Sequence, residues 1–191
     1  MFVNREYTKC VVITNYRTGS TSFVRKNSKG ISIKFEILQP YDNIPTIINK
    51  TKTLKEENYI CKIMPDHISY NYEHLDIVLE HCDQIVYLYR KDFVEQVKSW
   101  IAWNVSEDFG HHYGPMKTYD IDVSQKEVKK YEDTIRKNND FLTECYNKYP
   151  GEVFAYEDIQ NGRPYNRTNN WLTDPIIQPY NTQEMFNEVR V

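Results

Sequence analysis

The stretch Cys10–Thr14 (CVVIT), followed by Asn15–Ser22 (NYRTGSTS), decides the fold prediction. A short run of apolar and β-branched residues predicts a strand that is buried on both faces, as in a parallel sheet. The polar segment after it, with Gly19, predicts a turn, and we expect a short helix from Ser20 to about Asn27. A strand, a Gly-bearing polar turn and a helix form the opening of a phosphate-binding α/β unit.

The rest of the chain alternates between strand and helix patterns. Further strands are expected at Tyr59–Met64, Gln84–Tyr89 and Glu152–Tyr156. Helices are expected at Tyr72–Cys82, at Lys91–Trp103, and from a Ser124/Glu127 capping box to about Tyr149. This alternation predicts a three-layer α/β fold of the P-loop type, with a short parallel sheet flanked by helices. We expect one domain over residues 1–191, with 162–191 as an extended C-terminal tail and a closing helix near Thr182–Val189.

The composition predicts an ordered, cytoplasmic protein without a nucleic-acid or membrane partner. Lys and Arg number 24 and Asp and Glu 27, and the resulting net charge of -3 disfavours a general nucleic-acid binder. Aromatic residues make up 14% of the chain, which argues against disorder. The four cysteines form no CxxC pair, and Met1–Lys9 has no apolar signal core. The high content of Asn, Lys, Ile and Tyr favours a phage or bacterial origin.

The turn after the first strand has the composition of an anion site. A helix N-terminus presents free backbone N–H groups and the positive end of the helix dipole. Arg17 adds a cation, Gly19 allows close backbone approach, and the hydroxyls of Ser20–Ser22 add donors. The alternative is a capped turn that binds nothing. The nucleotide loop G-x-x-x-x-G-K-[ST] is absent, because the first Gly and the Lys are missing, so a kinase or GTPase fits poorly.

A second pattern begins where the strand Gln84–Tyr89 is expected to end. It reads R-x-D-x-x-x-Q-x-x-S-W and consists of Arg90, Asp92, Gln96, Ser99 and Trp100. An Arg at the carboxyl end of a parallel strand can meet a second phosphate where α/β proteins bind ligands. The alternative is an Arg that pairs with Asp92, beside a helix with an ordinary surface Ser.

Four segments, in this order along the chain, resemble the sulfotransferases that use 3′-phosphoadenosine-5′-phosphosulfate (PAPS). Tyr16–Phe23 (YRTGSTSF) is similar to their 5′-phosphosulfate loop, R-x-G-[ST]-T, and the pair Arg90 and Ser99 is similar to their 3′-phosphate motif. Lys62–Met64 (KIM) and Tyr156–Ile159 (YEDI) are similar to two further family segments. The Arg-to-Ser spacing is closest to the bacterial trehalose sulfotransferase branch. The resemblance covers roughly residues 10 to 160.

The resemblance implies PAPS as the cofactor, the desulfated product PAP, and no metal. The residues it implies for the 5′-phosphosulfate are Arg17, Thr18, Gly19, Ser20, Thr21 and Ser22, and those for the 3′-phosphate are Arg90 and Ser99. Many members close a late basic loop on the 3′-phosphate. The eukaryotic cytosolic form of that loop, R-K-G-x-x-G-x-W, is absent, so Arg163 or Arg167 is either its substitute or part of a solvated tail.

The catalytic base has two candidates. In-line sulfuryl transfer needs a group that removes the acceptor's proton and a cation that stabilises developing charge, the latter expected of Arg17. The resemblance implies a Glu some twenty residues past the loop Arg, where Glu36 stands between two apolar residues; its other reading is a solvent-facing strand Glu. His67 is the rival, because other branches use His; otherwise it caps a helix or lies on the surface. Lys62 is expected to bind the leaving phosphate or the acceptor, or else to be a strand-edge Lys.

The acceptor is expected to be a hydroxyl of a small molecule, a carbohydrate or a peptide. Its choice would depend on Ile37–Glu57, the His111-His112 loop and the Pro-rich tail, since little chain remains for a second domain. Glu157 and Asp158 are expected to bind the loop or cap the next helix rather than to do chemistry. The alternatives are a P-loop nucleotide kinase, which would need a loop Lys and Mg²⁺, and a non-catalytic nucleotide-binding module on the same fold.

Overall fold

The computed structural model describes residues 9–28, 31–35, 37–52, 54, 58–105 and 123–160. The His111-His112 loop, the tail from residue 162 and the closing helix expected near Thr182–Val189 lie outside these ranges. No helix within them has the length and the apolar content that crossing a bilayer requires.

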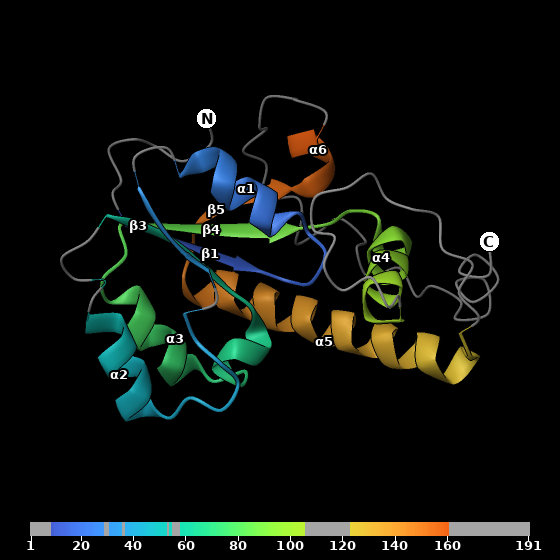
Figure 1. Cartoon of the computed structure of the whole chain (residues 1–191), viewed down its shortest axis with the longest axis horizontal. Coiled ribbons are helices and arrows are strands. Elements are labelled where there is room, and N and C mark those ends of the chain that lie inside the picture. The colour runs from blue at the N-terminus through green and yellow to red at the C-terminus, as the bar shows by residue number, and fades with distance from the viewer. Residues whose placement is uncertain are drawn as a thin grey trace.

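A single five-stranded sheet, in the order β2-β3-β1-β4-β5, forms the centre of the described chain (Figure 1). Its strands are β1 (Lys9–Thr14), β2 (Ser32–Phe35), β3 (Tyr59–Ile63), β4 (Gln84–Tyr89) and β5 (Glu152–Ala155). All neighbouring strands run parallel. The first strand is therefore central, and the chain leaves it at the edge where the carboxyl ends of β3 and β4 also lie. In parallel α/β sheets this edge is where ligands bind.

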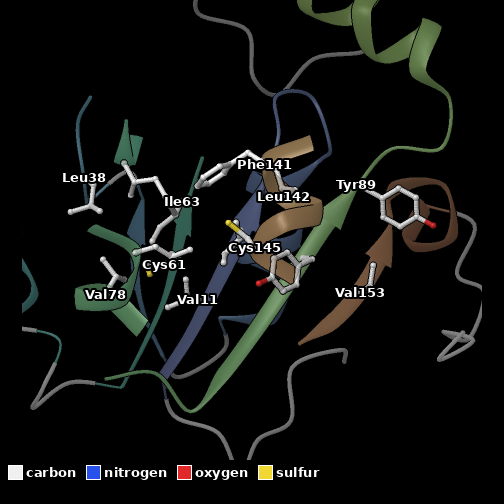
Figure 2. Packing of buried hydrophobic residues seen from close by; sticks show 14 of the residues in the cluster. Val11, Leu38, Cys61, Ile63, Val78, Tyr89, Phe141, Leu142, Cys145 and Val153 are labelled. Atoms are coloured by element: carbon white, nitrogen blue, oxygen red, sulfur yellow. The ribbon is translucent and has the colours of Figure 1, made fainter. Parts of the chain in front are cut away.

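Helices cover both faces of the sheet. The helices are α1 (Ser20–Asn27), α2 (Ile44–Lys52), the 3₁₀ helix η2 (Pro65–Ile68), α3 (Tyr72–Leu79), α4 (Phe93–Val105), α5 (Gln125–Lys148) and α6 (Tyr156–Gln160). On one face, α1 and α6 pack over alternate residues of the strands, and on the other α2, α3, η2 and α5 form the larger core (Figures 1 and 2). The protein is thus a three-layer α/β fold, as the sequence predicts.

A third apolar cluster joins α4 to the N-terminal half of α5. It contains Phe93, Val97 and Trp100 from α4 and Val128 and Ile135 from α5. In Figure 1 this part of α5 runs on past the strands, toward α4. Tyr16, from the segment after β1, packs against the same cluster. The α4–α5 unit therefore reaches the segment where the anion site is expected.

Most elements match the sequence prediction closely. The helix Ser20–Asn27 and the strand Gln84–Tyr89 are confirmed at both ends, and the capping box of Ser124 and Glu127 is present. Other ends differ by a few residues: the strand from Tyr59 ends at Ile63, and the helix from Tyr72 ends at Leu79.

Four of the described elements were not expected from the sequence: β2, α2, η2 and α6. The region Ile37–Glu57, expected as an insertion, contains α2, whose residues Ile44–Lys52 include Pro and several β-branched residues, which are poor helix formers. Burial of Ile47 and a cap from the Asn43 side chain to the Thr46 amide stabilise it instead. The edge strand β2 is only four residues long and pairs with β3 alone, so its sequence pattern is too short to detect.

Candidate anion-binding site

The segment between β1 and α1 is anchored to α5 by one buried amide. Asn15 is 1% exposed, and its Nδ2 donates to the Ile135 carbonyl (3.0 Å) and to Asn139 Oδ1 (2.8 Å). Its Oδ1 accepts from the Tyr16 amide (2.7 Å) and from Asn138 Nδ2 (2.9 Å). Both donors and both acceptor positions of this side chain are satisfied, so it fixes the start of the loop firmly.

Tyr16 is held from three sides. Its ring stacks on Trp100 with the centroids 4.3 Å apart, and its hydroxyl donates to Asp66 Oδ2 at 2.5 Å. Its carbonyl accepts from Gln96 Nε2 at 2.6 Å. These contacts come from α4 and η2, so the loop is attached to elements on both sides of β1.

The turn itself closes through Thr18 and Gly19. The buried Thr18 hydroxyl is hydrogen-bonded to Thr14 and donates to the Asn15 carbonyl (3.1 Å). This hydroxyl therefore supports the turn, and its use by a ligand would require these bonds to change. Gly19 has a left-handed backbone (φ 69°), and a Cβ added there would lie 2.5 Å from Cδ2 of Tyr156. Glycine is required both by the backbone and by the aromatic ring beside it.

Arg17 is the most constrained residue of the turn. Its φ of 57° lies in the left-handed region, which is unfavourable for a side chain of this size. Its Nε donates to Ser99 Oγ at 2.9 Å, across 82 residues of sequence. The two patterns that the sequence analysis singled out are therefore in direct contact, and Ser99 joins them.

Arg90 is close enough to Arg17 for their charges to interact. Burial, and then the positive charge of Arg90, lower the pKa of the Arg17 guanidinium from its ordinary value, and Tyr156 opposes this. Arg90 is itself largely buried; its guanidinium lies 4.9 Å from the centroid of the Tyr156 ring and its Nε 3.7 Å from Glu157 Oε1. Two cations held together at low solvent exposure repel each other, and a bound anion would relieve that repulsion.

The N-terminus of α1 offers further donors. Gly19 is its N-cap, no side chain of the described residues caps it, and its first turn contains no acidic residue. Of the hydroxyl residues expected to bind an anion, Ser20 is buried, Thr21 is partly buried and Ser22 is exposed. The free amides of a first helical turn attract negative charge.

Of the remaining candidate site residues, Lys62 and His67 lie within the described residues, and both are buried. Lys62 is 7% exposed and lies in register with Val12, so it is on the α1 face of the sheet and not a strand-edge Lys. His67 is 6% exposed within η2, so it is not a surface histidine. Glu36, Arg163, Arg167 and the pair His111-His112 lie outside the described residues. Within those residues, no group of three or more His, Cys, Asp and Glu side chains is arranged to hold a metal ion.

The structure adds supporting residues that the sequence did not single out. Asn15 was read only as part of a polar turn, and Asp66 carries no sequence signal that links it to Tyr16. The alternative pairing of Arg90 with Asp92 is not observed. Asp92 Oδ1 instead accepts from the Glu95 amide and caps α4, while Arg90 faces Glu157. The expectation that Glu157 caps the next helix was wrong: Glu157 lies within α6 and accepts from the amides of Lys91 and Asp92, just before the earlier helix α4.

Neither a scan against protein-family models nor a search of curated proteins matches this chain.

Proposed function

We propose that this protein is a sulfotransferase that transfers the sulfuryl group of PAPS to a hydroxyl of a small-molecule, carbohydrate or peptide acceptor. The observation that carries the proposal is the hydrogen bond from Arg17 to Ser99. It brings together the two segments that resemble the 5′-phosphosulfate and 3′-phosphate motifs of that family.

The charges of the site support a ligand with more than one anionic group. Arg17 and Arg90 stand close together, and the uncapped N-terminus of α1 adds backbone donors. A single phosphate would need only one of these features, whereas a cofactor with separate 5′ and 3′ anionic groups uses both arginines. The absence of a P-loop Lys from the loop favours PAPS over a nucleoside triphosphate.

The residues divide into four tasks under this proposal. Arg17 and the first-turn amides of α1 would hold the 5′ group and stabilise charge there, and Arg90 would hold the 3′-phosphate. PAPS would supply the sulfuryl group, and Glu36 or His67 would remove the acceptor's proton. Lys62, buried on the same face of the sheet as α1, would add positive charge beneath the site.

A thermal-shift titration tests the proposal. PAP at about 100 times its Kd should raise Tm by roughly 5–10 °C for a chain of this size. The shift should persist in EDTA, and ATP should give little. Incubation with PAPS labelled in the sulfuryl group, followed by a screen of sugar, phenol and peptide acceptors, then identifies the transfer.

Two variants provide the control. Arg90→Ala should abolish most of the PAP shift, whereas Arg25→Ala, an exposed arginine in the last turn of α1, should leave it unchanged. The proposal is wrong if PAP has no effect on the wild-type protein, or if Arg90→Ala leaves its effect intact. A shift by ATP that requires Mg²⁺ would support a kinase instead.

A further inference from the structure

One carboxylate outside the proposed ligand contacts binds the segment that begins with Arg90. Glu157, the second residue of α6, accepts from the Lys91 amide through Oε2 (3.0 Å) and from the Asp92 amide through Oε1 (3.2 Å). The same Oε1 lies 3.7 Å from Arg90 Nε. A single side chain therefore contacts three consecutive residues at the end of β4.

A chain of contacts runs from Glu157 through α4 to Arg17. Asp92, whose amide Glu157 binds, caps α4 by accepting from the Glu95 amide (2.9 Å). Two turns further along α4, Ser99 accepts from Arg17 Nε. Glu157 is thus linked to Ser99 through the Asp92 amide and α4.

Glu157 also lies directly beside Arg90. The Nε of Arg90 is shielded from solvent and, within the described part of the chain, has no hydrogen-bond partner; the nearest acid is Glu157. Its guanidinium also lies over the Tyr156 ring, the residue before Glu157. A guanidinium has five N–H donors, and the four on its two terminal nitrogens can bind a phosphate in a bidentate manner. Contact on the Nε edge would orient the group and leave those donors available.

We infer that Glu157 is a positioning residue that holds Arg90 and the start of α4 in the geometry required to recognise the 3′-phosphate. The inference rests on the proposed function. Glu157 also carries a negative charge near the phosphate, and this acts in the opposite direction. Its side chain is 27% exposed, so that repulsion is screened, whereas its two bonds to backbone amides are direct. Removing the carboxylate should therefore weaken binding.

The test measures the ratio of affinities for PAP and for adenosine 5′-phosphate, which isolates the contribution of the 3′-phosphate. Glu157→Gln keeps the size of the side chain but loses the charge and one of its two acceptor oxygens. We expect it to weaken PAP binding about tenfold and to leave adenosine 5′-phosphate binding within about twofold. Asp158→Asn is the matched control, since within the described residues Asp158 pairs only with the exposed Lys91 side chain; its ratio should equal that of wild type.

A double-mutant cycle with Arg90→Ala separates positioning from a general loss of stability. If Glu157 acts through Arg90, Glu157→Gln should not change the ratio further in the Arg90→Ala background. An unchanged or tighter PAP affinity in Glu157→Gln, or an equal loss for both nucleotides, overturns the inference. If Glu157→Gln does not fold, Glu157→Asp takes its place, since it keeps the charge and can reach one amide; a reduced ratio supports the inference and a wild-type ratio overturns it.

Failure of the sulfotransferase proposal can be told apart from failure of the inference about Glu157. If the wild-type protein binds no PAP, the sulfotransferase proposal fails, and the positioning role is measured with inorganic pyrophosphate and by hydrogen exchange. Glu157→Gln should then weaken pyrophosphate binding and speed exchange at the amides of Lys91 and Asp92, and Asp158→Asn should do neither. Exchange and binding at wild-type levels would overturn the inference independently of the nucleotide.

Discussion

The two arginines of the site are held by different kinds of contact. Arg17 belongs to a loop that is fixed by the amide of Asn15, which is buried and bonded to α5 through neutral groups. Arg90 is held by the ring of Tyr156 and the charge of Glu157, both partly exposed on α6. The loop of Arg17 is therefore anchored in the core. The position of Arg90 depends on contacts that solvent and salt can weaken.

Because of this difference, we expect changes near the two arginines to affect different quantities: the stability of the fold in one case and the ligand affinity in the other. Changes to the buried Asn15 anchor of the Arg17 loop should reduce the stability of the whole fold, because its bonds are shielded from water and cannot be replaced. Changes behind Arg90 should mainly alter ligand affinity and its dependence on salt. The Arg90 and Glu157 variants described above test the binding half of this comparison. The variants below test the loop of Arg17, beginning with the largest expected effect.

Asn15→Ala should destabilise the protein by about 3–5 kcal/mol, because it leaves several buried donors and acceptors without partners. Guanidinium denaturation measures this loss. Asn43→Ala is the matched control: Asn43 is an exposed cap of α2, and its removal should cost about 1 kcal/mol. Equal losses of stability for the two variants would show that the buried Asn15 stabilises the fold no more than an exposed helix cap does.

Arg17→Gly should raise stability and reduce binding at the same time. Glycine relieves the left-handed backbone, for a gain of about 0.5–1 kcal/mol, while PAP affinity should fall about 100-fold as the charge is lost. Denaturation and calorimetric titration give the two values. Ser69→Gly, at another residue with positive φ (52°), should leave PAP affinity unchanged. A destabilised Arg17→Gly would contradict the strain assigned to this residue.

Gly19→Ala should cost about 2–3 kcal/mol, combining the left-handed backbone with the close approach of the Tyr156 ring. In Gly19→Ala combined with Tyr156→Leu, the steric part should be relieved, so the two losses should not add. Additive losses would mean that the ring does not limit the residue at position 19.

Ser99→Ala should have the smallest effect. It removes one hydrogen bond to Arg17, so PAP affinity should fall about three- to tenfold with Tm nearly unchanged. Ser99→Thr, which keeps the hydroxyl, should restore most of the affinity. A large fall in Tm would place Ser99 among the residues that stabilise the loop rather than the arginine.

Sequence patterns predicted the fold well where burial is continuous. The runs CVVIT and QIVYLY are buried along almost their whole length, and such runs identify central strands of a parallel sheet. Helix α2 was missed because its stability comes from the burial of Ile47 against distant residues and not from its own propensity. The same holds for the site. Arg17, Ser99 and Arg90 could be predicted because they belong to local motifs. The roles of Asn15 and Asp66 could not, because they depend on partners far away in sequence.

The attachment of the loop has a consequence for folding kinetics. Asn15 binds Ile135 across 120 residues, and Arg17 binds Ser99 across 82. These contacts form only after loop closures that are entropically unfavourable, and a parallel sheet adds more of them, so refolding should be slow. Anion binding would then appear last, after the strands have paired. Recovery of ligand binding during refolding would thus report completion of the native state more strictly than recovery of secondary structure.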